Sequence, residues 1–154
     1  MEIYFSVFGL IFSIIYSASE IALISANPMQ IKVWQKQKMY FSSFATKIID
    51  KKPTYITVIL IGTNLSNVLA TSFFTIYLSS IISNTILVVC IIAGIILLFG
   101  EVIPKTISHE FSNTGILLFS PFLVVSYYLF YPFFFILNKT NWLDVATEST
   151  LTDE

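Results

Sequence analysis

The residues best suited to chemistry are polar side chains that recur inside three strongly apolar stretches. The first stretch carries Ser13, Ser17 and Glu20, and the second carries Thr63, Asn64, Asn67 and Thr71, each set spaced to share one face of a helix. The third carries Gly100-Glu101 and then Pro104-Lys105. Hydroxyl, amide and carboxylate oxygens suit a hard cation. None of the three groups contains His, Cys or Met, which argues against copper, zinc or iron.

The stretches that hold these groups are typical of membrane-spanning helices. Residues 3–19, 54–100 and 111–138 contain no Asp, Glu, Lys, Arg or His. A helix needs about 20 apolar residues to cross a ~30 Å hydrocarbon core. We therefore predict an all-α membrane protein with spans at about 3–24, 54–82 and 85–105. The net charge of −1 gives no basic surface for nucleic acid.

The segment between the first two predicted spans differs from the rest of the chain. Asn27-Pro28 ends the first span, and residues 28–52 carry six of the eight basic residues against Asp50 alone. Their interspersed apolar residues favour short amphipathic helices on the membrane surface. Because positive loops stay in the cytoplasm, we expect the N-terminus outside and, with three spans, the C-terminus inside.

The stretch 115–137 leaves two interpretations open on physical grounds. It is apolar enough to be a fourth span, which would place the C-terminus outside. Pro121 and Pro132 each remove a backbone donor, and the density of Phe and Tyr suits the headgroup zone. These features favour a helix that lies along the membrane surface.

Depth brings the polar groups of the three predicted spans together. Counted along helices, Ser17 lies roughly 20 Å below the outer surface and Glu101 roughly 24 Å below it. Thr63 and Asn67 lie roughly 14–20 Å above the cytoplasmic surface. A helical Pro104 has no N–H for the Gly100 carbonyl, which is left free beside Glu101. The predicted metal ligands are Ser17, Thr63, Asn67, Gly100 and Glu101.

Each group also has a purely structural interpretation. Serine and threonine hydroxyls in spanning helices often bond their own helix or join two helices. Glu20 could meet a lysine near the inner surface, and Glu101 could pair with Lys105 one turn later. The pair least well explained by packing is Asn67 with Glu101.

Three motifs resemble those of the cyclin M/CorC family of magnesium transporters. They are Ser17-Ala18-Ser19-Glu20-Ile21-Ala22-Leu23, Gly62-Thr63-Asn64-Leu65-Ser66-Asn67 and Phe99-Gly100-Glu101-Val102-Ile103-Pro104-Lys105, in the family's order and spacing. The resemblance covers about residues 1–150.

The resemblance implies a homodimeric domain of three spans, residues 1–138, in which 115–137 is a juxtamembrane helix that belts the domain. It implies that Mg²⁺ binds in an inward-facing cavity through Ser17, Thr63, Asn67 and Glu101; the Gly100 carbonyl is our addition. Relatives often have Asn or Ser where this chain has Thr63. Residues 139–154 resemble the linker into cytosolic CBS domains.

We therefore expect a multi-pass plasma-membrane protein that exports Mg²⁺ by alternating access, with Na⁺ entry as a candidate driving force. The alternative is a membrane ion sensor or scaffold that transports nothing itself and regulates another transporter. We do not expect an enzyme, because the chain lacks a nucleophile–base pair and its only histidine, His109, lies at the predicted interface.

Overall fold

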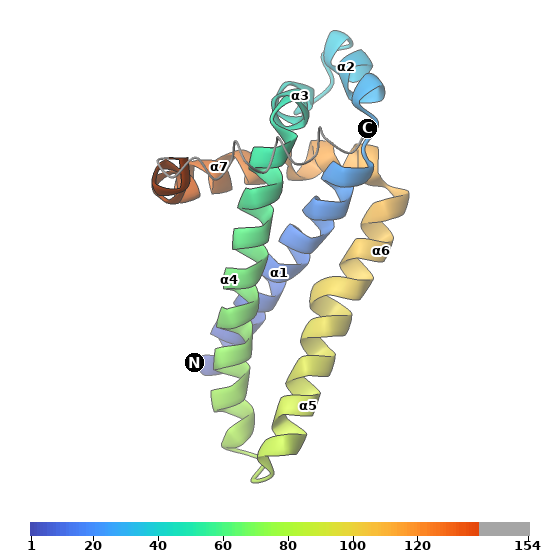
Figure 1. Ribbon diagram of the computed structural model, residues 1–154. Coiled ribbons are helices and arrows are strands. Elements are labelled where there is room, and N and C mark those ends of the chain that lie inside the picture. The colour runs from blue at the N-terminus through green and yellow to red at the C-terminus, as the bar shows by residue number, and fades with distance from the viewer. Residues whose placement is uncertain (139–154) are drawn as a thin grey trace, which may run out of the picture.

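A computed structural model describes residues 1–138 of the chain, with side chains described as far as residue 132. These residues form helices joined by short connections (Figure 1). The helices are α1 (Glu2–Ser25), α2 (Pro28–Lys36), α3 (Ser42–Asp50), α4 (Lys52–Ser79), α5 (Thr85–Ile95), the π-helix η1 (Ile96–Val102), α6 (Ile103–Glu110) and α7 (Ser112–Asn138). The predicted linker 139–154 lies outside the described residues.

The predicted all-helical membrane architecture is confirmed, but four helices rather than three have the length and composition to cross a membrane. They are Glu2–Ser25, Lys52–Ser79, Thr85–Glu110 and Ser112–Pro132. The first two begin and end within three residues of the predicted spans. The third continues through η1 and α6 to Glu110, five residues past the predicted end, because Pro104 lies in the first turn of α6 and is tolerated there.

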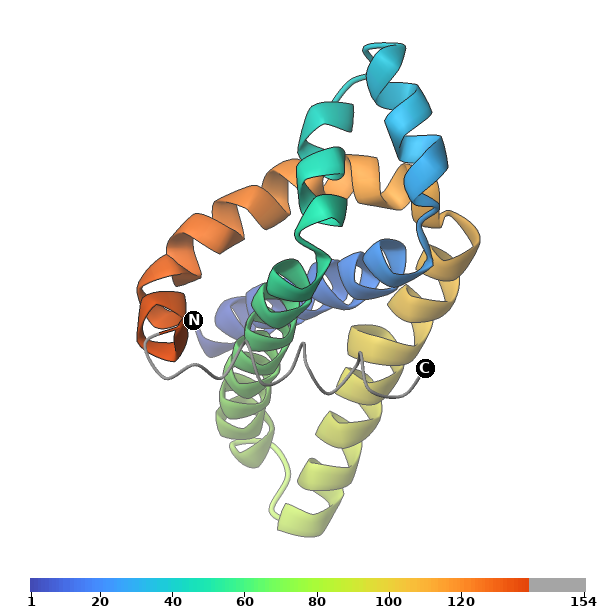
Figure 2. The same cartoon turned by 45° about the horizontal axis from the view of Figure 1, so that its top comes forward.

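The direction of α7 sets it apart from the other three long helices. In Figure 1, α1, α4 and α5–α6 run along the length of the molecule, while α7 runs crosswise to them at the end where α2 and α3 lie. Figure 2 shows that α7 follows a curved path around that end. Pro121 and Pro132 lie inside α7, where missing hydrogen bonds allow such curvature. The helix begins at Ser112, three residues earlier than predicted.

Short side chains determine how closely α1 approaches its neighbours. Its buried residues include Ser6, Gly9, Ser13 and Ser17, and α4 is the helix it packs against most extensively. A Cβ atom added at Gly9 would lie 2.8 Å from the backbone nitrogen of Ala70 in α4. Such contact between small residues is how spanning helices gain packing energy in lipid, where burial of apolar surface gives none.

Hydroxyl groups fasten α6 and α7 to α1. The Tyr16 hydroxyl lies 2.8 Å from the Ser126 hydroxyl of α7, and both residues are buried. Ser108 of α6 donates to the Ala18 carbonyl at 2.6 Å. Around these bonds, Leu23, Ile59 and other fully buried apolar residues fill the space between α1, α4 and α7.

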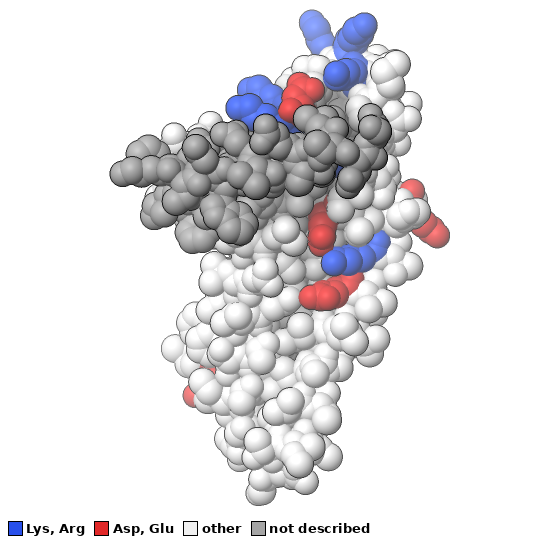
Figure 3. All heavy atoms as spheres, viewed as in Figure 1, with Lys and Arg blue, Asp and Glu red and all other residues white. Residues whose placement is uncertain are grey.

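Charged side chains gather at one end of the molecule. In Figure 3 the basic side chains lie over α2 and α3 and beside α6, while the opposite half of this face is almost uncharged. Lys32 pairs with Asp50 at 3.9 Å between α2 and α3. The predicted amphipathic helices are thus present, and they lie at the same end as α7.

The contact at Gly9 generates a stability prediction with a matched control. Gly9→Ala is expected to lower the free energy of unfolding by about 1–3 kcal/mol, because the Ala70 backbone must move. Gly94→Ala is the control, since a Cβ there meets nothing within 4 Å. Thermal unfolding of the purified proteins in one detergent measures both. Equal melting temperatures for Gly9→Ala and the wild type would contradict the close approach.

Candidate metal centre

A chain of two hydrogen bonds joins one side chain from each of the three lengthwise helices. Ser13 of α1 donates to the Asn67 Oδ1 of α4 at 2.6 Å. The Asn67 Nδ2 donates to the Glu101 Oε1 of η1 at 3.2 Å. Ser13 is fully buried, and the other two are partly buried. The predicted meeting of Asn67 with Glu101 is confirmed, and the geometry adds Ser13 to it.

The π-helix brings Gly100 and Glu101 to this cluster. A π-helix adds a residue to a helical turn, and such turns are frequent at functional sites. Gly100 is buried, and its carbonyl oxygen lies 3.5 Å from the Ser13 hydroxyl, at the long limit of a hydrogen bond. A Cβ at Gly100 would lie 3.1 Å from the same hydroxyl. Glycine therefore lets the backbone carbonyl face α1 beside the Glu101 carboxylate.

Ser17 lies one helical turn beyond Ser13 and has an unusual environment. The residue is fully buried. Its Oγ is the one buried side-chain oxygen or nitrogen within residues 1–132 that has no hydrogen-bond partner. Leaving a buried polar group unpaired costs about 1–3 kcal/mol, so such a group calls for an explanation. A hydroxyl that has no protein partner is available to a ligand, in keeping with its place in the predicted ligand set.

Thr63 lies four residues before Asn67 on α4, and its hydroxyl is already used. It donates to the Ile59 carbonyl of its own helix at 2.9 Å, which is the structural interpretation of a threonine in a spanning helix. The oxygen keeps its lone pairs, so this bond does not prevent it from coordinating an ion. Asn64 is exposed and lies outside the hydrogen-bonded chain, and Thr71 donates to the Asn67 carbonyl.

The lysine near the site does not neutralise Glu101. Lys105 pairs with Glu20 at 3.0 Å, and the Glu20 side chain is only 17% exposed. The alternative in which Glu101 pairs with Lys105 is therefore wrong, while the alternative in which Glu20 meets a lysine is confirmed. Among the described side chains, the hydrogen-bond donor to the Glu101 carboxylate is the neutral Asn67 amide. The negative charge of the Glu101 carboxylate is consequently available to a cation.

Glu101 also lines a pocket. It has a volume of about 330 Å³ and lies between α4 and the helix formed by α5 and η1. Thr71 and Thr75 line it, followed by apolar residues of α5. These residues are closer in sequence to the α4–α5 turn than Glu101 is, so the pocket leads from Glu101 toward that turn.

Comparison with known proteins agrees with the resemblance seen in the three motifs. A family model described as the cyclin M transmembrane N-terminal domain matches residues 4–152. A UPF0053 protein of Haemophilus influenzae is 25% identical over 131 residues, which cover 84% of this chain and 31% of that protein. The UPF0053 inner membrane protein YfjD of Escherichia coli is 28% identical over 95 residues, or 60% of this chain and 22% of that protein. The chain thus spans less than a third of either relative.

The different environments of the serines predict different effects of their removal. Ser13→Ala leaves the Asn67 Oδ1 without its donor and should cost about 1–2 kcal/mol of stability. Ser17→Ala removes an unpaired hydroxyl and should leave the melting temperature unchanged or raise it. Ser19→Ala is the control for removing a buried hydroxyl that is bonded within its own helix, because Ser19 donates to the Ile15 carbonyl. Thermal unfolding without divalent cations measures all three, and a loss for Ser17→Ala equal to that for Ser13→Ala would show that Ser17 has a partner.

Proposed function

The chain belongs to the family of cyclin M transmembrane N-terminal domains, and we propose that it exports Mg²⁺ across the plasma membrane. The proposed ligands are Ser17, Thr63, Asn67, the Gly100 carbonyl and Glu101. The observation that carries the proposal is the hydrogen-bonded chain Ser13–Asn67–Glu101. It joins three membrane helices through side chains whose hydroxyl, amide and carboxylate oxygens are the ligands that hard cations prefer.

The proposed topology has three spans, with α7 along the membrane surface. Its support is the crosswise direction of α7 together with its two internal prolines. The tyrosines of α7 suit the headgroup zone, and the lysines of α2 and α3 at the same end favour the cytoplasmic side. On this reading the N-terminus is outside and α2, α3 and the end of α7 are cytoplasmic. We propose with it that the protein is a homodimer and that 139–154 leads into cytosolic CBS domains.

The Asn67 amide suggests how ion binding and helix packing are coupled. Without an ion, one N–H of the amide donates to the Glu101 Oε1 and the amide oxygen accepts from Ser13. A cation held by Glu101 and by the Asn67 oxygen would take the place of the bond between Asn67 and Glu101. The amide would turn its oxygen toward the ion and its N–H toward Ser13, whose hydroxyl would then accept. Ion binding therefore exchanges contacts between helices for contacts with Mg²⁺, which keeps several of its waters.

Alternating access follows if this exchange changes how the helices pack. A ligand shifts a conformational equilibrium only through different contacts with the two states. The pocket beside Glu101 supplies the outward route in this proposal, because it leads toward the α4–α5 turn, which is outside in the proposed topology. The single carboxylate binds Mg²⁺ moderately, as passage requires. The Glu20–Lys105 pair compensates a lysine charge that would otherwise repel the ion.

The test is Mg²⁺ flux from proteoliposomes that contain the full-length protein. Asn67→Ala and Glu101→Gln should each slow flux by on the order of tenfold or more, because a lost contact to a charged group costs about 1.5–3 kcal/mol. Asn64→Ala is the matched control, since Asn64 is an exposed residue of the same helix. Flux at the wild-type rate in the Asn67 and Glu101 variants would refute the site.

Two further arms decide between mechanisms. An opposing Na⁺ gradient should accelerate flux if Na⁺ entry drives export, and an unchanged rate would remove Na⁺ coupling from the proposal. Folded wild-type protein that moves no Mg²⁺ would instead favour the ion sensor or scaffold. In that case Mg²⁺ should still raise the melting temperature of the wild type, and Ser17→Ala should lose this effect while Ser19→Ala keeps it.

The proposed topology is tested with single cysteines in a Cys90→Ser background. Tyr40→Cys reports the α2–α3 connection, Ser83→Cys the α4–α5 turn, and Asn138→Cys the end of α7. A membrane-impermeant thiol reagent added outside intact cells should label the cysteine at 83 alone. Labelling of the cysteine at 138 from outside would show that α7 crosses the membrane. Labelling of the cysteine at 40 from outside would show that the orientation is the reverse of the proposed one.

A further inference from the structure

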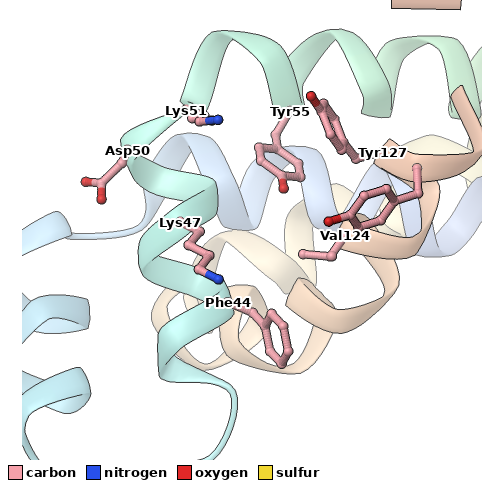
Figure 4. A pocket seen from close by; sticks show the side chains of 8 residues that line it. Phe44, Lys47, Asp50, Lys51, Tyr55, Val124 and Tyr127 are labelled. Atoms are coloured by element: carbon pink, nitrogen blue, oxygen red, sulfur yellow. The ribbon is translucent and has the colours of Figure 1, made fainter. Parts of the chain in front are cut away.

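A second pocket lies at the charged end of the molecule, between α3, the start of α4 and α7. Its volume is about 470 Å³. It is lined by Phe44, Lys47, Asp50, Lys51, Tyr55, Val124, Tyr127 and Tyr128 (Figure 4). None of these residues belongs to the proposed Mg²⁺ site, so the pocket requires an explanation of its own.

The pocket has an excess of positive charge. Lys47 and Lys51 lie four residues apart at the end of α3, and neither forms an ion pair with any side chain that the structure describes. Asp50, the one acidic residue in the lining, pairs with Lys32 instead. Figure 4 shows its carboxylate pointing away from Val124 and Tyr127. Two lysine charges therefore remain for an anion.

The remaining walls combine aromatic rings with phenol groups. The rings of Tyr55 and Tyr127 lie 5.5 Å apart between centroids, which closes the α4 side of the pocket against α7. Tyr55 is buried, and Phe44 and Val124 add apolar surface. Tyrosine in such a place presents an apolar body and a polar tip, which suits the boundary between headgroups and acyl chains.

We propose that this pocket binds the phosphate of an anionic phospholipid. Lysine ammonium groups and phenol hydroxyls donate to phosphate oxygens, and charge-assisted bonds of this kind are among the strongest in proteins. The acyl chains would follow the exposed apolar residues of α7, such as Val125 and Leu129, which are 68% and 69% exposed. This site rests on the surface placement of α7 in the proposed function.

The location gives the bound lipid a structural consequence. Lys51 is the residue at the junction of α3 and α4, and Tyr55 lies in the first turn of α4, the helix that carries Asn67. A phosphate held by Lys51, Tyr55 and residues of α7 ties the surface helices to the base of α4. The lipid would thereby fix the position of α4 against α7.

The experiment is native mass spectrometry of the full-length protein in detergent with defined lipids. Wild type should retain phosphatidylglycerol in preference to phosphatidylcholine of the same acyl chains. The double variant Lys47→Gln/Lys51→Gln should bind phosphatidylglycerol more weakly by on the order of tenfold, as expected for the loss of two lysines facing an anionic lipid. Lys36→Gln/Lys38→Gln removes the same charge outside the pocket and should bind as the wild type does.

Three outcomes would overturn the inference. Equal weakening in both double variants would show a general surface attraction, and full retention in the pocket variant would remove the lysines from lipid binding. Inorganic phosphate that displaces phosphatidylglycerol completely would identify a soluble anion as the occupant.

Mg²⁺ flux of the wild type is measured separately, so absent flux with selective lipid binding would refute the transport function alone. Thermal unfolding verifies that the variants are folded.

Discussion

The structure depends on the need of polar groups within a membrane to find partners inside the protein. The buried residues of α1 are largely serine, glycine and alanine, and at Gly9 the backbone of α1 comes close to that of α4. Polar groups of α1 therefore meet those of other helices directly: the Ser13 hydroxyl donates to Asn67, and the Ala18 carbonyl accepts from Ser108 of α6. Because lipid offers no competing hydrogen bonds, these contacts fix the relative position of α1, α4 and α6.

The same constraint explains why α7 can lie across the bundle rather than beside it. Tyr16 extends from α1 to the Ser126 hydroxyl, so one buried bond ties the middle of α7 to the centre of the fold. The rings of Tyr16 and Phe122 lie 4.9 Å apart and add packing to that bond. A helix bound in this way needs no regular parallel contact with the others. Its outer side carries the large exposed residues Leu118, Val125 and Leu129, as a helix partly immersed in lipid would.

Much of this arrangement could be predicted from sequence, because charge-free stretches and prolines determine where spanning helices begin and end. The common depth of Asn67 and Glu101 was also predictable, since it follows from counting residues along the apolar stretches, whereas their direct hydrogen bond was not. The π-helix at Ile96–Val102 was not predictable either, because apolar composition is the same in an α-helix and in a π-helix that span a membrane. Ser13 lies on the predicted face of the first span but outside the predicted ligand set, and its spacing of four from Ser17 is the signal for it in the sequence. The choice of Lys105 between Glu20 and Glu101 depends on how α1 and α6 approach each other, which sequence spacing does not specify.

The Asn67 amide has one donor end and one acceptor end, and the structure uses both. Glu101 accepts from the donor end, and Ser13 donates to the acceptor end. A carboxylate needs positive charge nearby when water is excluded, and the amide N–H supplies only a part of it. A cation at Glu101 would supply that charge in full, and the amide nitrogen would then have no reason to face the carboxylate. In the proposed mechanism the turned amide would present its N–H to Ser13, whose hydroxyl can accept as well as donate, so the bond between α1 and α4 would reverse its direction when the ion is held. The proposed Mg²⁺ site would thus be coupled to the contact between α1 and α4 through a single side chain, Asn67, which takes part in both.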